Sequence, residues 1–341
     1  MLIREKNPHG GQIYGQNIKA DFSVNINPQG TPKQVIKAAL ESIYESEQYP
    51  DAECKMLRKY ISRKENISEE NIICGNGGAE LIFQVAAALR PAKALIIEPT
   101  FCEYRQSVEA WGGKVKTLTL DEDFDINRQV STIEFNISED IDIVFLCNPN
   151  NPTGKTADIN TVSRIAERCE KMGALLFIDE SFGEMAENYK SFSAVGMVPE
   201  RKNIFVLKSM TKTYAMPGIR LGYGLCSDKE IIDRMCSMSQ CWNISLAAQK
   251  AGEAAIKDCG DYVEKTLRII KEEKEYLKRV FDSDANFMLI KAEENFKEKM
   301  LRKGILVRAC DNFEGLGKEY FRIAVKNHED NKIFTEAVRT L

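Results

Sequence analysis

The chain has 341 residues, of which 43% are hydrophobic and 29% charged, and its 47 basic and 51 acidic residues give a net charge of -4. This length fits about two domains, and the composition is that of a folded globular protein, so disorder and a small disulfide-stapled scaffold are excluded. The charge balance argues against a nucleic-acid partner. The chain has two histidines, His9 and His328, which excludes a histidine-rich metal site and means that any Ser-His-Asp or Cys-His triad must use one of them. We expect no metal ion.

The N-terminal residues and the cysteines both favour a cytoplasmic protein. Residues 1–11 carry charge and proline where a signal peptide needs an apolar segment. No stretch approaches the roughly 18 consecutive apolar residues of a membrane span, so no membrane partner is expected. The ten cysteines are scattered from Cys54 to Cys310 without a CxxC pair, which is typical of reduced thiols. For Cys102 and Cys147, which lie near the site described below, we expect a packing role.

In chain order, the first 48 residues predict an extended arm with turns, followed by a short helix over 33–46 that Pro32 opens. From Asn71 onward, short apolar runs alternate with segments of helical periodicity. The strand-like runs are 94–99, 142–149, 174–180 and 203–209, and the helical segments are 79–89, 159–172 and 229–238. Continuous apolar runs separated by helices predict a mostly parallel sheet, buried on both faces, in an α/β domain.

After Trp242 the pattern changes to a long charged helix over 247–281, short strands over 287–291, 305–308 and 320–325, and a last helix over 329–341. This mixture of expected helices and short strands predicts a smaller second domain of the α+β class. We therefore expect three parts. They are an N-terminal arm that contributes to the small domain (1–45), a large domain (46–242) and the small C-terminal domain (243–341).

Polar clusters follow three of the predicted strands directly. They are NPNNPTG at 148–154, Asp179 with Glu180, and SMTK at 209–212. Because ligands of open α/β sheets bind outside the carboxyl ends of the strands, we expect these clusters to converge on one site.

Two of these residues and one glycine-rich turn suggest a specific chemistry. Lys212 at a strand end would be partly desolvated and so nearer to a usable nucleophile, and Asp179 would need a cationic or hydrogen-bonding partner. The segment GNGGAE at 75–80 could cradle a phosphate at the start of a helix. Singly, these features could be a surface lysine, a helix N-cap and an ordinary turn. Together, they are the groups that pyridoxal phosphate requires.

The motifs GNGGAE, NPNNPTG, DESF and SMTKTYAMPGIRLGY occur in the order and approximate spacing of fold-type I pyridoxal-phosphate enzymes. The resemblance covers essentially the whole chain. It implies the fold of that family, an α/β architecture in which a large domain with a mostly parallel sheet flanked by helices is joined to a smaller α+β domain.

The resemblance also implies a role for individual residues. Lys212 would bond the cofactor as a Schiff base, and Asp179 would pair with the pyridinium nitrogen. The other implied cofactor contacts are Gly78, Ala79, Ser209 and Arg220 to the phosphate, Asn151 to the ring O3′, Phe101 stacked on the ring, Phe182 near O3′, and Tyr49 from the second subunit of a homodimer.

Within this fold type the chain resembles two groups, the threonine-phosphate decarboxylases of cobalamin biosynthesis and the histidinol-phosphate aminotransferases. Four features favour the decarboxylases. They are the HGG opening at 9–11, the NINP form with Ile26 where aminotransferases usually carry glutamate, Phe182 where most carry tyrosine, and the C-terminal pattern that contains Arg308 and Arg322.

The expected substrate contacts follow from this resemblance. Arg322 would bind a substrate carboxylate, Arg308 and His9 would face a substrate phosphate, and Asn151 would also touch the substrate. The ordinary alternatives are a surface ion pair for Arg308 and a disordered terminus for His9.

The resemblance therefore implies a homodimeric, pyridoxal-phosphate-dependent decarboxylase (a lyase) of O-phospho-L-threonine or a close analogue such as phosphoserine. The leading alternative is a histidinol-phosphate aminotransferase (a transferase of histidine biosynthesis) that uses 2-oxoglutarate. A non-catalytic cofactor-binding sensor is a remote one, because few residues precede the expected fold to form a helix-turn-helix.

Overall fold

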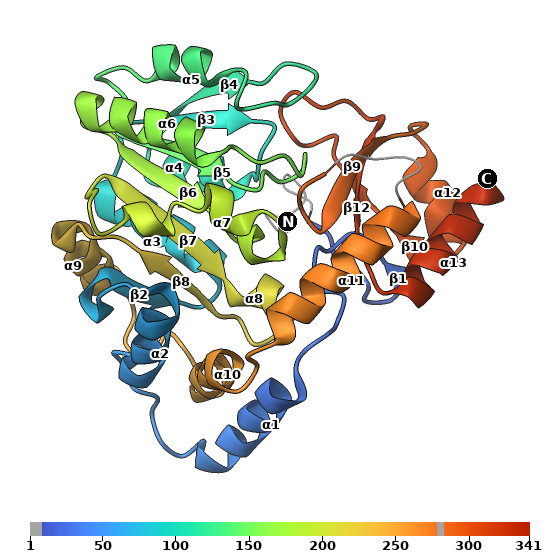
Figure 1. Cartoon of the computed structure of the whole chain (residues 1–341), viewed down its shortest axis with the longest axis horizontal. Helices are drawn as coiled ribbons and strands as arrows, with labels where there is room; N and C mark the ends of the chain where they lie inside the picture. Colours follow the sequence, from blue (N-terminus) through green and yellow to red (C-terminus); the bar gives the residue numbers. More distant parts are fainter. Residues whose placement is uncertain (1–8, 278–282) are drawn as a thin grey trace.

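The computed structural model describes residues 9–277 and 283–341 (Figure 1). Its centre is a seven-stranded sheet of order β2-β8-β7-β6-β5-β3-β4. The strands are β2 (Ile72–Gly75), β3 (Lys93–Glu98), β4 (Lys114–Thr119), β5 (Ile143–Cys147), β6 (Leu175–Asp179), β7 (Ile204–Ser209) and β8 (Gly222–Leu225). Strand β8 runs antiparallel to both of its neighbours, β2 and β7, and the remaining pairs are parallel, so the predicted mostly parallel sheet is confirmed.

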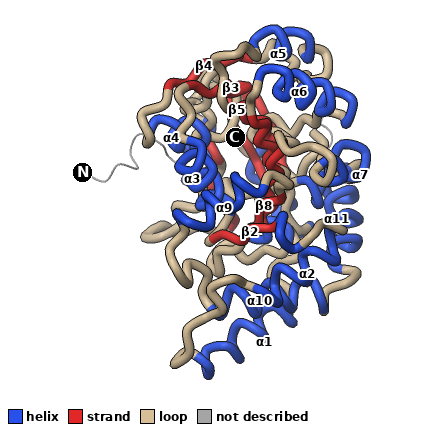
Figure 2. The backbone as a smooth tube through the Cα atoms, turned by 90° about the vertical axis from the view of Figure 1, so that its left-hand side faces the viewer, coloured by secondary structure: helices blue, strands red, loops and turns tan. Residues whose placement is uncertain are grey.

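Helices cover both faces of this sheet (Figure 2). One face carries α3 (Gly78–Leu89), α4 (Glu103–Glu109) and α9 (Lys229–Met238), and the other carries α2 (Lys55–Glu65), α5 (Val130–Asn136) and α6 (Ile159–Met172). Short helices α7 (Tyr189–Phe192) and α8 (Met210–Thr213) and 3-10 turns at Glu69–Asn71, Gly183–Met185 and Val195–Met197 complete this part.

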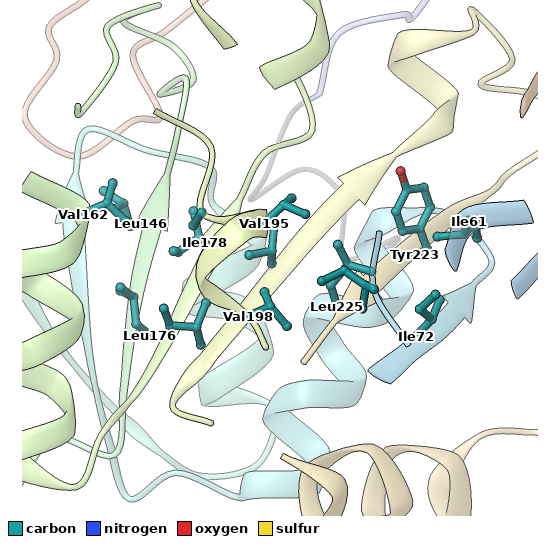
Figure 3. Packing of buried hydrophobic residues seen from close by; sticks show 14 of the residues in the cluster. Ile61, Ile72, Leu146, Val162, Leu176, Ile178, Val195, Val198, Tyr223 and Leu225 are labelled. Atoms are coloured by element: carbon teal, nitrogen blue, oxygen red, sulfur yellow. The ribbon is translucent and has the colours of Figure 1, made fainter. Parts of the chain in front are cut away.

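Successive side chains of each strand point to opposite faces of the sheet, and this alternation produces two hydrophobic cores, one on each face. In β5, Val144 and Leu146 join the core beneath α6, whereas Ile143 and Phe145 join the core beneath α3 and α4. Figure 3 shows the first of these cores, with Leu146 beside Val162 of α6. The apolar runs in the sequence are continuous because both faces of the sheet are buried.

A smaller unit of strands and helices lies beside the large sheet (Figure 1). A three-stranded antiparallel sheet has the order β11 (Arg308–Ala309), β12 (Tyr320–Ala324), β9 (Phe287–Lys291). The N-terminal strand β1 (Ala20–Asp21) pairs in parallel with β10 (Ile305–Leu306). Helices α12 (Phe296–Arg302) and α13 (His328–Arg339) pack on this unit, with Phe296 and Phe334 in its core.

Two sequence expectations are wrong in detail. The helix expected over 247–281 is two helices, α10 (Leu246–Lys257) and α11 (Tyr262–Leu277), separated at Asp258–Asp261. Gly260 lies in this break, where its low helix propensity favours an interruption. The strand expected over 305–308 is divided between β10 and β11, which belong to different sheets. Residues 278–281 of the expected helix lie outside the described residues.

Helix α1 (Lys33–Ser42), followed by a 3-10 turn at Ile43–Glu45, packs against α10. Side chains of both helices, among them Val35 and Ala251, join the core beneath the large sheet. The domain limits expected at 45 and 243 stay predictions. No helix within the described ranges is long and apolar enough to cross a membrane. The ten cysteines are all free thiols.

Candidate active site

A cavity of about 220 Å³ lies at the carboxyl ends of β5, β6 and β7, where the three polar clusters meet. It brings together nearly all the residues singled out from the sequence. They are His9, Gly78, Ala79, Phe101, Asn151, Asp179, Phe182, Ser209, Lys212, Arg220, Arg308 and Arg322. Tyr49 does not line this cavity. It is 75% exposed and stacks on Trp242, with 4.2 Å between ring centroids, so its role in a second subunit stays a prediction.

Lys212 lies in α8, directly after β7, and its ammonium group is 5.8 Å from the centroid of the Phe182 ring. Burial lowers the pKa of Lys212 to about 8, and the positive charges of Arg322 and Arg220 act in the same direction. Asp179 opposes this shift. A pKa this low leaves a usable fraction of neutral amine near neutral pH, as a nucleophilic lysine needs.

Asp179, the last residue of β6, is 5% exposed. Its Oδ2 accepts a hydrogen bond of 2.7 Å from the Tyr104 hydroxyl, and its Oδ1 accepts one of 2.8 Å from the Ser181 amide. Burial raises the pKa of Asp179, whereas these hydrogen bonds and Lys212 lower it. The carboxylate is therefore held in a fixed orientation at the cavity and can bind a protonated ring nitrogen.

The glycine-rich turn before α3 forms one wall of the cavity. Gly77, the N-cap of α3, has φ +83°, a left-handed conformation that favours glycine, and a Cβ there would lie 2.5 Å from Nη2 of Arg220. Gly222 of β8 allows the turn to approach closely, since a Cβ on it would lie 2.8 Å from the Gly78 amide nitrogen. The helix N-terminus and Arg220 thus face the same place and can bind a phosphate.

Arg322 of β12 connects three segments of the chain. One Nη donates a hydrogen bond to Asn151 Oδ1, and the other donates one of 2.8 Å to the carbonyl oxygen of Ser23. Since Asn151 accepts through its oxygen, its NH₂ group is the end that can donate to a ligand. The small unit, the N-terminal arm and the large sheet therefore meet at this guanidinium.

Arg308 and Arg322 are direct cross-strand partners in the β11–β12 pair, so both side chains lie on the same face of the small sheet. Each is 7% exposed, and neither forms an ion pair with a carboxylate among the residues that the structure describes. Arg308 donates to Asn312 Oδ1 at 2.7 Å. Burial lowers the pKa of Arg322 to about 10, and Arg308 contributes to that shift. Two buried cations without a carboxylate partner favour an anionic ligand.

Three further predicted residues line the cavity wall. His9 lies 5.9 Å from Phe101 between ring centroids, and its Nε2 is 2.9 Å from Oε1 of Glu103. Phe182 contacts Phe287 edge to face. Ser209 forms a 2.6 Å hydrogen bond with the Thr211 hydroxyl at the start of α8.

Sequence reasoning missed two residues of this site, Tyr104 and Asn25. Tyr104 is fully buried and stacks on Phe145. Asn25 is 1% exposed and lines the cavity, yet no described group bonds to its side-chain nitrogen or oxygen. Tyr104 lies three residues after Phe101, and Asn25 is the first residue of NINP, so each lies beside a residue that the sequence analysis singled out.

The chain is similar in sequence to proteins of one known family. A family model described as aminotransferase class I and II matches residues 17–338. The threonine-phosphate decarboxylase of Salmonella typhimurium is 33% identical over 94% of this chain and 90% of its own length. The histidinol-phosphate aminotransferase of Methanocaldococcus jannaschii is 30% identical over 93% and 87%.

A solved structure of a related protein shows the same fold. The histidinol-phosphate aminotransferase of Clostridium acetobutylicum is 33% identical, with a TM-score of 0.85 over 94% of this chain and 98% of that one. The resemblance and the fold expected from the sequence are thereby confirmed. The chain therefore belongs to the class I and II aminotransferases, a family of fold-type I pyridoxal-phosphate enzymes.

Proposed function

We propose that this enzyme decarboxylates O-phospho-L-threonine or a close analogue such as phosphoserine. The observation that carries the proposal is the pair of buried arginines, Arg308 and Arg322, which have no carboxylate partner among the described residues and face the cavity together. A phosphorylated amino acid has two anionic groups that could neutralise them. Histidinol phosphate has only its phosphate.

The residues of the cavity fit pyridoxal phosphate. The start of α3 and Arg220 would hold its phosphate, Asp179 its ring nitrogen, Asn151 its phenolic oxygen and Phe101 the face of its ring. Phe182 has no hydroxyl to donate to that oxygen, which agrees with the difference from most aminotransferases noted in the sequence. When bound, the cofactor supplies an electron sink for the bonds of the substrate Cα.

Asn25 and His9 support a phosphorylated substrate. A buried amide without a partner costs roughly 1–3 kcal/mol, so a ligand that bonds to Asn25 would remove this cost. We assign the phosphate to Arg308, His9 and Asn25, and the carboxylate to Arg322. Arginine binds a carboxylate by two parallel hydrogen bonds, a geometry that lysine cannot reproduce.

By holding both ends of the substrate, the arginines would select which bond of Cα breaks. In the proposed reaction the bond from Cα to the carboxyl group breaks, carbon dioxide leaves, and a proton takes its place at Cα. We assign delivery of that proton to the Lys212 amine, whose lowered pKa suits proton exchange near neutral pH. The product is aminopropanol phosphate.

We also propose that the active enzyme is a homodimer. Helix α1 and the following 3-10 turn expose a continuous apolar surface, which consists of Ile36, Leu40, Ile43 and Tyr44. The exposed Tyr49 follows this surface in the chain and would reach the cofactor phosphate of the second subunit.

The proposal is tested with purified protein loaded with cofactor. Phosphothreonine without any keto acid should yield carbon dioxide and aminopropanol phosphate in equal amounts. Lys212→Ala should abolish both this activity and the absorbance band of lysine-bound cofactor. If phosphothreonine is not consumed while histidinol phosphate with 2-oxoglutarate yields glutamate, the chain is an aminotransferase and the proposal is wrong.

A further inference from the structure

An imidazole, a thiol and a carboxylate lie together beside the active-site cavity. His9, Cys102 and Glu103 each offer one ligand atom, and these three atoms lie within 4.8 Å of one another. All three side chains are half-buried, and His9 and Cys102 line the cavity itself. None of the cofactor contacts assigned above uses Cys102 or Glu103.

We propose that these three residues form a zinc-binding site. Nitrogen, sulfur and oxygen ligands together suit Zn²⁺, whereas Mg²⁺ and Ca²⁺ prefer oxygen alone. Tetrahedral zinc, with bonds of about 2.0–2.3 Å, places its ligand atoms about 3.3–3.6 Å apart. The separation of 2.9 Å between His9 and Glu103 and the upper limit of 4.8 Å bracket this distance, so small side-chain movements are sufficient.

The two halves of the site come from different parts of the fold. Cys102 and Glu103 are adjacent at the start of α4, which the fully buried Tyr104 anchors to the large sheet. His9 belongs to the N-terminal arm, which is held by a 2.8 Å hydrogen bond from the Gly11 amide to the Ser23 hydroxyl. Bound zinc would therefore join the arm to α4 beside the cavity, and the Cys102 thiol proton would pass to solvent.

Zinc bound in this way would occupy His9, which the proposed reaction assigns to the substrate phosphate. The site would therefore be inhibitory, with zinc and substrate competing for the cavity. This consequence rests on the proposed function, but zinc binding itself does not. Three protein ligands leave a fourth position for water, as at zinc sites that remain open.

The binding test uses the enzyme loaded with cofactor, titrated with zinc against a chromophoric chelator. We expect one zinc ion per chain. Cys102→Ser and Glu103→Gln should each raise the dissociation constant at least about tenfold, since loss of even an outer-shell partner costs that much. Cobalt in place of zinc should give the visible absorption of a tetrahedral thiolate site, at longer wavelengths than the cofactor absorbs, and Cys102→Ser should remove it.

Matched controls separate this site from adventitious binding. Cys241→Ser removes an exposed thiol elsewhere, and Glu109→Gln removes another carboxylate of α4, so both should bind zinc as the original chain does. Cofactor absorbance and thermal unfolding show that each variant is folded. The proposal is overturned if the original chain does not bind one zinc ion per chain. It is also overturned if Cys102→Ser and Glu103→Gln both bind zinc as tightly as the original chain does, or if Cys241→Ser loses zinc binding.

The kinetic test follows on the same protein. Zinc should raise the KM for phosphothreonine in proportion to its concentration and leave kcat unchanged, and Cys102→Ser should be insensitive to zinc. If the enzyme does not act on phosphothreonine at all, the proposed function fails while the chelator titration still decides whether the zinc site exists. Inhibition that Cys102→Ser retains would contradict the inhibitory role.

Discussion

The Lys212 amine has a pKa of about 8, which is lower than the ordinary lysine value of 10.5 because the side chain is buried near two arginines. Only the neutral amine can attack the cofactor aldehyde. We therefore expect the rate at which cofactor-free enzyme recombines with pyridoxal phosphate to rise with pH up to about 8 and to level off above it.

Stopped-flow absorbance over a pH series measures this rate. The reaction of pyridoxal phosphate with a free lysine derivative, followed over the same range, corrects for titration of the cofactor itself. A rate that continues to rise toward pH 10.5 would show that the environment of Lys212 does not shift its pKa as described.

We infer that Tyr104 is a positioning residue that acts through Asp179, to whose carboxylate it donates a hydrogen bond. Tyr104→Phe removes the 2.7 Å hydrogen bond to the Asp179 carboxylate but keeps the ring that stacks on Phe145. A hydrogen bond to a charged group is worth about 1.5–3 kcal/mol, so we expect the pKa of Asp179 to rise further and the affinity for the cofactor to fall about tenfold or more.

Equilibrium dialysis of the cofactor and the pH dependence of its absorbance measure these effects. Tyr276→Phe is the control, because its hydroxyl bonds to Thr335 at the surface, away from Asp179. Equal cofactor affinity in Tyr104→Phe and the original chain would mean that Asp179 does not depend on this hydrogen bond.

Position in the chain was sufficient to place Lys212 and Asp179 at the cavity, because each follows an apolar run that could be recognised as a strand. Tyr104 and Asn25 carry no such signal. Their roles depend on which way a helix side chain and a loop side chain point, and burial decides this only after the small unit and the arm have packed against the sheet.

Among the elements, the turn that begins α3 has a strict backbone requirement at Gly77. Gly77→Ala would place a Cβ at φ +83° and 2.5 Å from Arg220. We expect a loss of about 1–3 kcal/mol in the free energy of unfolding and weaker binding of the cofactor phosphate, since the turn and Arg220 would both shift.

Denaturant unfolding and cofactor titration measure the two effects. Gly196→Ala is a matched control, because its φ is not positive and its Cβ would meet no atom within 4 Å. If Gly77→Ala binds the cofactor as tightly as Gly196→Ala does, the turn is not the phosphate cradle.

The central strands were predictable from sequence because both of their faces are buried. Strand β4, KVKTLT, lies at the sheet edge and mixes charged with apolar residues, and β8, GYGL, is half glycine, so neither forms a strong apolar run. The break between α10 and α11 was missed because helical periodicity continues on both sides of Gly260. A change in packing partner there, from α1 to α13, could not be read from the periodicity.

For the whole molecule, the apolar surface of α1 and its following turn bears on assembly. Leu40 lies within this apolar surface and is 63% exposed, and Leu40→Glu would place a charge there. We expect this substitution to convert a dimer to monomers in analytical ultracentrifugation and to lower activity, because Tyr49 could then not reach a second cavity.

Phe135→Glu is the control, since Phe135 is an exposed aromatic residue on α5, at a distance from α1 in the fold (Figure 1). If Leu40→Glu remains a dimer, or if the original chain sediments as a monomer, the apolar surface of α1 does not form a dimer interface.

The central claim is that the two buried arginines select decarboxylation of a phosphorylated amino acid. The most direct test is the ratio of two kcat/KM values measured on one preparation, for decarboxylation of phosphothreonine and for transamination of histidinol phosphate with 2-oxoglutarate. We expect the first to exceed the second and Arg322→Lys to reduce it at least about tenfold, because the bidentate contact is lost. A larger value for histidinol phosphate would contradict the claim.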